Sequence, residues 1–233
     1  MLSWNQIALL IAPWLLVATT YLVYQLLERR FGKKRSYLGG FLFYWILWCM
    51  LFPLALLGPQ TLVQLFRCAP SPFGHPWWLG AFCLIAPPLV AFVFLFPTAM
   101  RKASVKLMLV SALLAIVNGP LEEVLWRGAY LTLFPGQFWL ALLYPSVGFA
   151  LWHLAPMSIV PPAVGGRGGK AALVAEVCFL GFLWAWVANN TGVILWTAIA
   201  HILIDFSALG WDVLFTGNQS ISAPTGPRRK AQP

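Results

Sequence analysis

Charged residues are scarce in this sequence, and acidic residues are the scarcest among them. Only 9% of the 233 residues are Asp, Glu, Lys or Arg, whereas 61% are apolar. A soluble domain carries roughly 25% charged residues, so water cannot be the solvent for most of this surface. The chain is therefore expected to lie in a lipid bilayer, and its apolar runs leave no room for a separate soluble domain.

The sequence also lacks the patterns of disulfide-rich proteins, cysteine metal sites, nucleic-acid-binding proteins and cleaved signal peptides. The four cysteines form no CxxC pair and lie mostly in apolar runs, which argues against a disulfide framework or a cysteine metal site. The net charge of +9 comes from short basic clusters, without stripes of interleaved stacking aromatics, which argues against nucleic acid as a partner. The N-terminus MLSWNQ lacks the positive start of a cleaved signal peptide, so the apolar run after it predicts a first membrane span.

Seven apolar segments reach or approach the ~20 residues that a helix needs to cross a bilayer. They cover residues 4–27, 37–58, 77–99, 106–133, 137–157, 170–190 and 192–215. The predicted fold class is all-α, a polytopic transmembrane bundle of about seven to eight spans. We expect residues 1–216 to form a single transmembrane domain and residues 217–233 to form a disordered cytoplasmic tail.

The basic residues lie in alternate connections between the predicted spans. Thirteen of the fifteen Lys and Arg residues follow the first, third, fifth and seventh spans. By the positive-inside rule, this pattern places the C-terminus in the cytoplasm and the N-terminus outside. The short chain without retention signals favours a bacterial inner-membrane protein, with membrane lipid as a partner.

Six ionisable side chains fall inside the apolar segments: Glu122, Glu123, Arg127, His153, His201 and Asp205. Placing such a group in hydrocarbon costs at least about 2.5–3.5 kcal/mol. Buried ionisable groups persist in membrane helices where they line a cavity and pair with one another. We therefore interpret these residues as a functional site.

The spacing of these residues assigns them to helix faces. Glu123 and Arg127 are four residues apart and are expected to pair on one face. This pairing leaves Glu122, about 100° around the helix, free to act. His201 and Asp205 share the same spacing, so several helices can each present a polar group to one cavity.

Three motifs carry a resemblance to a known family. They are Glu122-Glu123-x-x-x-Arg127, Phe149-x-x-x-His153 and His201-x-x-x-Asp205, each in a separate apolar segment. In this order they resemble the signature of the CPBP family, which comprises CAAX prenyl endopeptidases and bacteriocin-processing or abortive-infection proteins. The resemblance covers the region from about 107 to 210, and the first three predicted spans resemble no family.

The resemblance implies an intramembrane endopeptidase with a water-accessible catalytic cavity inside an eight-helix or similar bundle. It implies Glu122 as the general base that activates water, assisted by His153, with Glu123, Arg127 and Phe149 in supporting roles. His201 and Asp205 are implied to stabilise the oxyanion. An ionised Asp205 cannot donate a hydrogen bond, so it is expected to orient His201 or to stay protonated.

Two alternatives stay open at this point. The first is a divalent metal such as zinc, held by Glu122, His153 and His201, although the sequence has no HExxH motif. The metal-free mechanism is slightly favoured. The second is a non-catalytic membrane protein, either an immunity or scaffold protein or a transporter, that uses the buried charges as structural or partner-binding groups. An enzyme of this family is expected to act on a peptide or lipidated protein, prenylated or not.

The depth of two candidate residues raises a geometric question. If the fourth span begins near residue 107, Glu122 lies about 22 Å above its start, at ~1.5 Å per residue. His153 then lies well below Glu122 on the next span. We therefore predict a kinked or partly re-entrant segment between them, with breaks at Gly119-Pro120 and Pro145.

Overall fold

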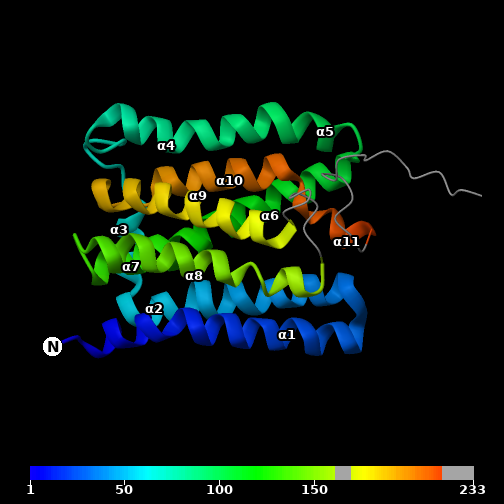
Figure 1. Cartoon of the computed structure of the whole chain (residues 1–233), viewed down its shortest axis with the longest axis horizontal. Helices are drawn as coiled ribbons and strands as arrows, with labels where there is room; N and C mark the ends of the chain where they lie inside the picture. The colour runs from blue at the N-terminus through cyan, green and yellow to red at the C-terminus, as the bar shows by residue number, and fades with distance from the viewer. Residues whose placement is uncertain (161–168, 217–233) are drawn as a thin grey trace, which may run out of the picture.

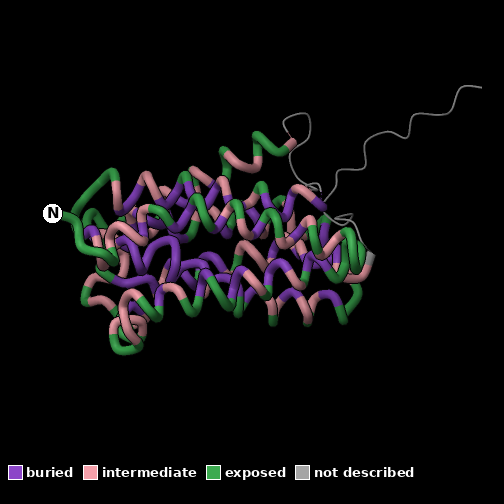
Figure 2. Tube along the Cα trace, turned by 90° about the horizontal axis from the view of Figure 1, so that it is seen from below, coloured by how far each residue is buried: buried purple, intermediate pink, exposed green. Residues whose placement is uncertain are grey.

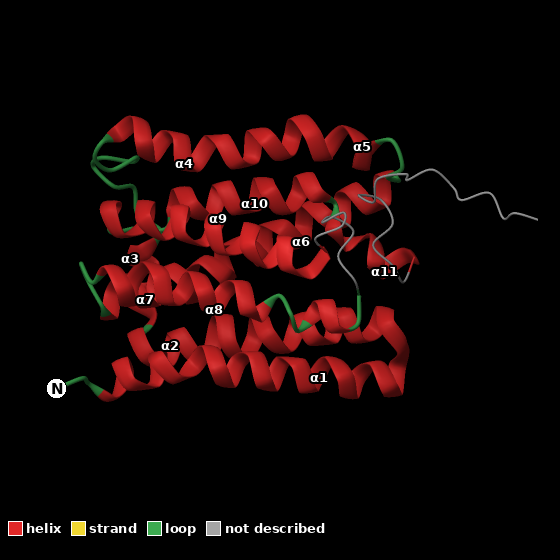
Figure 3. Ribbon diagram, viewed as in Figure 1, coloured by secondary structure: helices red, strands yellow, loops and turns green. Residues whose placement is uncertain are grey.

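This computed structural model describes residues 1–160 and 169–216, which form helices joined by loops and turns and contain no strand (Figure 3). The predicted tail at 217–233 lies outside the described residues. The α-helices are α1 (Trp4–Phe43), α2 (Phe52–Leu57), α3 (Pro59–Leu65), α4 (Trp77–Val90), α5 (Phe96–Met100), α6 (Val105–Glu123), α7 (Ala129–Leu133), α8 (Tyr144–Trp152), α9 (Gly169–Thr191), α10 (Leu195–Ala208) and α11 (Val213–Thr216). The π-helical segments are η1 (Tyr44–Leu51), η2 (Ala91–Leu95), η3 (Val124–Gly128) and η4 (Phe138–Leu143), and short 3₁₀ turns lie at η5 (Pro156–Ser158) and η7 (Gly210–Asp212).

The helices run side by side along the long axis of the molecule as one bundle (Figure 1). The first two predicted spans form a hairpin that turns at Gly32, where φ is 74° and ψ is 169°. This conformation is essentially restricted to glycine. Beyond the turn, Ser36 donates a hydrogen bond to the carbonyl of Tyr24, and the return helix packs against the first one.

Among the described residues, five helical stretches are long and apolar enough to cross a membrane: Trp4–Leu57, Trp77–Met100, Val105–Leu133, Phe138–Ser158 and Gly169–Thr191. The first contains both predicted N-terminal spans. The prediction for 192–215 was wrong in its length, because α10 covers only 14 residues. It ends where Leu209 adopts the left-handed conformation, with φ at 46°, and the 3₁₀ turn η7 follows.

Burial divides the bundle into an interior and a lipid-facing exterior. Figure 2 shows buried residues along the middle of the bundle and exposed residues along its outer edges. Many large apolar side chains are among the exposed residues, including Trp14, Ile85 and Leu109. Because long apolar helices present this surface, the chain is an integral membrane protein. In its interior, α10 packs against α6 and α4, and α8 packs against α9.

Candidate active site

Four of the predicted site residues line one cavity of about 230 Å³. Glu122 comes from α6, His153 follows α8, and His201 and Asp205 lie on α10. The rest of the wall is mostly apolar and aromatic. The structure therefore brings together residues that are 83 positions apart in the sequence.

A glycine allows the two main site helices to approach closely. A Cβ atom added at Gly119 would lie 2.9 Å from Cγ1 of Ile202 and 3.0 Å from its backbone nitrogen. Gly119 precedes Glu122 by one helical turn, and Ile202 follows His201. The absence of a side chain at Gly119 thus lets α6 and α10 pack closely enough for their polar groups to meet.

The predicted pair of Glu123 and Arg127 is confirmed. Nη1 of Arg127 lies 2.9 Å from Oε1 of Glu123, and both side chains are almost completely buried. The guanidinium group also stacks over the ring of Phe149 at 4.5 Å and lies 5.6 Å from that of Trp184. Phe149 therefore supports the ion pair through a cation–π contact between helices.

Arg127 pairs with Glu123, as expected, and Glu122 contacts two other side chains. Its Oε2 lies 3.2 Å from Nε2 of His201 and accepts a hydrogen bond from Nδ2 of Asn118 at 3.1 Å. The contact with Asn118 is local, because the two residues are four apart on α6, whereas the contact with His201 comes from α10. Its other oxygen, Oε1, is buried and has no hydrogen-bond partner in the described part of the chain.

His201 lies at the centre of the polar cluster. Its Nδ1 is 2.9 Å from Oε1 of Glu123, and its Nε2 faces Glu122. Oδ1 of Asp205 lies 3.7 Å from the same Nε2. The side chain of Asp205 is 21% exposed, against 1% for Glu122, so Asp205 is the carboxyl group more open to the cavity.

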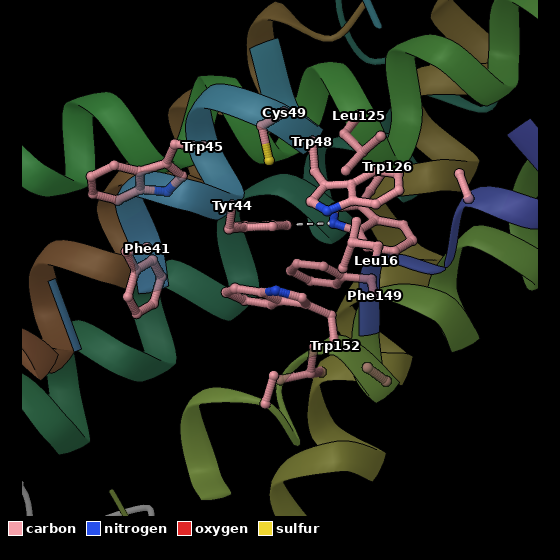
Figure 4. Packing of buried hydrophobic residues seen from close by; sticks show 14 of the residues in the cluster. Leu16, Phe41, Tyr44, Trp45, Trp48, Cys49, Leu125, Trp126, Phe149 and Trp152 are labelled. Atoms are coloured by element: carbon pink, nitrogen blue, oxygen red, sulfur yellow. Dashed lines mark hydrogen bonds between the residues drawn. The ribbon is translucent and has the colours of Figure 1, made fainter. Parts of the chain in front are cut away.

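His153 is oriented by its own helix. Its Nδ1 lies 2.8 Å from the carbonyl oxygen of Phe149, one turn earlier. Since a carbonyl can only accept, Nδ1 carries the proton and Nε2 of the neutral ring is left as an acceptor. Beside it, the indole of Trp152 stacks on the ring of Tyr44 at 4.0 Å, and Tyr44 accepts a hydrogen bond from Trp126 (Figure 4). These aromatic rings make a rigid wall behind His153.

Glu122 and His153 reach similar depths without a re-entrant segment. The helix that carries Glu122 continues through η3 and α7 to Leu133, for 29 residues in total. Glu122 lies about 17 Å from that end, and His153 lies about 23 Å below the start of the return helix at Phe138, at ~1.5 Å per residue. The predicted irregularity is present instead as π-helical turns at Val124–Gly128 and Phe138–Leu143.

Sequence reasoning missed Asn118 and Trp45, which both contact this network. Asn118 donates to Glu122 and, at 2.7 Å, to Oδ2 of Asp205, while Trp45 donates to Asn118 at 2.7 Å. A signal for Asn118 was present, because it is a polar residue four positions before Glu122 in an apolar segment. Nothing in the sequence distinguished Trp45 from the other twelve tryptophans.

The predicted metal ligands do not fit a metal ion as they are arranged. Among residues 1–160 and 169–216, no group of three or more His, Cys, Asp or Glu side chains is placed to hold one. Both ring nitrogens of His201 face carboxylate oxygens, and Nδ1 of His153 is bonded to a carbonyl. This geometry is that of a hydrogen-bonded network.

One family model matches the part of the chain that carries this site. Residues 104–207 match the family model described as type II CAAX prenyl endopeptidase Rce1-like, and all three motifs lie within them. No curated protein and no solved structure matches the chain. Residues 104–207, which carry the buried Glu-Glu-Arg, Phe-His and His-Asp motifs around one cavity, are therefore similar to the Rce1-like CAAX prenyl endopeptidases that this family model describes.

Proposed function

We propose that this protein is an intramembrane endopeptidase that hydrolyses peptide bonds with a water molecule activated by Glu122 and His153. The observation that carries the proposal is the convergence of Glu122, His153, His201 and Asp205 on one largely apolar cavity. A membrane helix retains such groups where they serve a site. Peptide hydrolysis needs a base for water, a stabiliser of the oxyanion and an acid for the leaving amine.

The two oxygens of Glu122 support its assignment as the general base. Oε2 is held by Asn118 and His201, whereas Oε1 has no partner among the described residues. An oxygen of this kind can accept a proton from cavity water as that water attacks the substrate carbonyl. The same carboxyl group then returns the proton to the leaving amine. His153 supplies a second acceptor, Nε2, that orients the water.

His201 supports an electrostatic role in the same reaction. A doubly protonated His201 can donate on one side to Glu123 and on the other to Glu122. Its positive charge in an apolar cavity then stabilises the oxyanion as it forms. Asp205, at 3.7 Å from Nε2 of His201, orients that ring and does not itself need to donate a hydrogen bond.

The cavity wall indicates the class of substrate. About 230 Å³ holds a peptide bond with a small side chain, and the apolar lining favours an apolar C-terminal segment. The lining side chains of this type include Tyr37, Phe41, Trp152, Met157, Leu173, Ile204 and Trp211. We propose a peptide or lipidated protein as substrate, with removal of the last three residues of a prenylated CAAX sequence as the specific reaction.

Cleavage by the purified protein tests this proposal. Farnesylated and unmodified peptides of one CAAX sequence are incubated with the protein in detergent, with and without a chelator, and the products are identified by mass spectrometry. We expect Glu122→Gln and His153→Ala to lower kcat by about 10²–10⁴-fold, the usual contribution of a general acid–base group. The matched control is Glu176→Gln, the same change at an exposed carboxylate on α9.

The results of this cleavage assay distinguish the proposed mechanism from the metal-dependent and non-catalytic alternatives. Unchanged cleavage in Glu122→Gln contradicts the assigned base. Loss of cleavage on chelation supports the metal alternative over the metal-free mechanism. The non-catalytic alternative is supported if the folded wild-type protein cleaves neither peptide and Glu122→Gln changes only its thermal stability.

A further inference from the structure

A buried amide lies between the two carboxyl groups that face the cavity. Asn118 is one helical turn before Glu122 on α6, is 6% exposed and lines the cavity. Its Nδ2 lies 3.1 Å from Oε2 of Glu122 and 2.7 Å from Oδ2 of Asp205. One nitrogen atom thus links α6 to α10 across the cavity.

A third residue fixes the orientation of this amide. Nε1 of Trp45, on η1, lies 2.7 Å from Oδ1 of Asn118. Because an indole N–H can only donate, the amide oxygen must face Trp45 and the NH₂ group must face the carboxylates. The ring of Trp45 is itself buried and packs against the ring of Phe41 (Figure 4) and that of Trp211.

The number of N–H donors on the Asn118 amide limits its role in the reaction. An amide has two N–H donors, and here one goes to Glu122 and the other to Asp205. No donor remains for a substrate or an oxyanion, so Asn118 does not touch the reacting atoms. Its effect on the reaction has to pass through the two carboxyl groups.

We propose that Asn118, oriented by Trp45, is a positioning residue that holds Glu122 and Asp205 in their reactive geometry. By binding Oε2, it leaves Oε1 of Glu122 as the oxygen available for water. It also places a pair of donors between two carboxylates that otherwise repel each other in apolar surroundings. This inference rests on the proposed endopeptidase function and adds to it a fourth helical segment, η1.

Three substitutions at Asn118 and its partner test the role. Asn118→Leu keeps a similar volume and removes both donors, whereas Asn118→Ser keeps one donor. Trp45→Phe removes the N–H that orients the amide. The matched control is Trp48→Phe, because Trp48 is also buried on η1 and donates from Nε1, but to Thr19, away from the cavity. Each variant is measured for kcat, KM and thermal unfolding, beside wild type and Glu122→Gln.

We expect Asn118→Leu to lower kcat by about 10–100-fold with KM changed less than two-fold, because misplaced carboxylates slow the reaction without removing substrate contacts. Asn118→Ser should recover part of the loss, Trp45→Phe should lower kcat about three- to ten-fold, and Trp48→Phe should change it less than two-fold. Activity that falls only in step with thermal stability overturns the inference in favour of a purely structural role.

Wild type and Glu122→Gln distinguish a failure of the positioning role from a failure of the endopeptidase function. Equal kcat in wild type and Asn118→Leu, while Glu122→Gln is inactive, overturns the positioning role and leaves the endopeptidase function standing. If Asn118→Leu does not fold, the test compares kcat of Trp45→Phe with that of Trp48→Phe. Equal kcat in these two variants overturns the inference. A folded wild-type protein without cleavage overturns the function and this inference together.

Discussion

At the scale of single residues, Arg127 stabilises the buried acidic cluster. Its guanidinium group lies 2.9 Å from Glu123, and both side chains are almost fully buried. Removing one partner of a buried ion pair leaves an uncompensated charge, at a cost of about 3–5 kcal/mol. We therefore expect Arg127→Met to lower the thermal unfolding temperature in detergent strongly. Arg29→Met, at an exposed position, should leave it nearly unchanged. Similar unfolding temperatures for both variants would contradict this account.

At the scale of elements, the contact between α6 and α10 decides whether the site forms. Gly119→Ala places a methyl group within 3.0 Å of Ile202, including its backbone nitrogen. Since backbone cannot rotate away, the helices have to separate, at a cost of about 1–3 kcal/mol. We expect lower thermal stability together with weaker cleavage. Gly210→Ala is the control for stability, because its Cβ meets nothing within 4 Å and its φ is not positive.

At the scale of the whole molecule, basic residues gather at one end of the bundle. The Gly32 hairpin, the turn after α5 and the last helix α11 lie together there (Figure 1). Lys34 donates to the carbonyl of Phe215 from α11, and the ammonium group of Lys106 lies 5.6 Å from the Phe215 ring. By the positive-inside rule we propose that this end is cytoplasmic and that the loop before α4 is outside.

A native cysteine makes this orientation testable. Cys68 is exposed in the loop between α3 and α4, whereas Cys49 and Cys83 are buried. We expect a membrane-impermeant maleimide to label wild-type protein at Cys68 in intact cells. In a Cys68→Ser background, Lys33→Cys should be labelled only after the membrane is permeabilised. The reverse pattern of labelling would show the opposite orientation.

The local parts of the site were predictable from the sequence because the α-helix fixes them. Residues four apart share a face, so the pairing of Glu123 with Arg127 and the approach of His153 to the Phe149 carbonyl follow from spacing. The contact of Glu122 with His201 did not follow, because His201 lies on another helix. Helices that are apolar all round carry no periodic signal for which face meets which neighbour.

The sequence by itself determined the solvent, the helical class and the set of ionisable residues, because hydrocarbon excludes charge and requires internal backbone hydrogen bonds. Tertiary structure alone decided the length of α10 and the close packing at Gly119. It also decided the network that runs from Trp45 through Asn118 to Glu122 and Asp205. The packing at Gly119 and the contacts between helices in this network depend on distances that arise only when side chains from separate segments pack together.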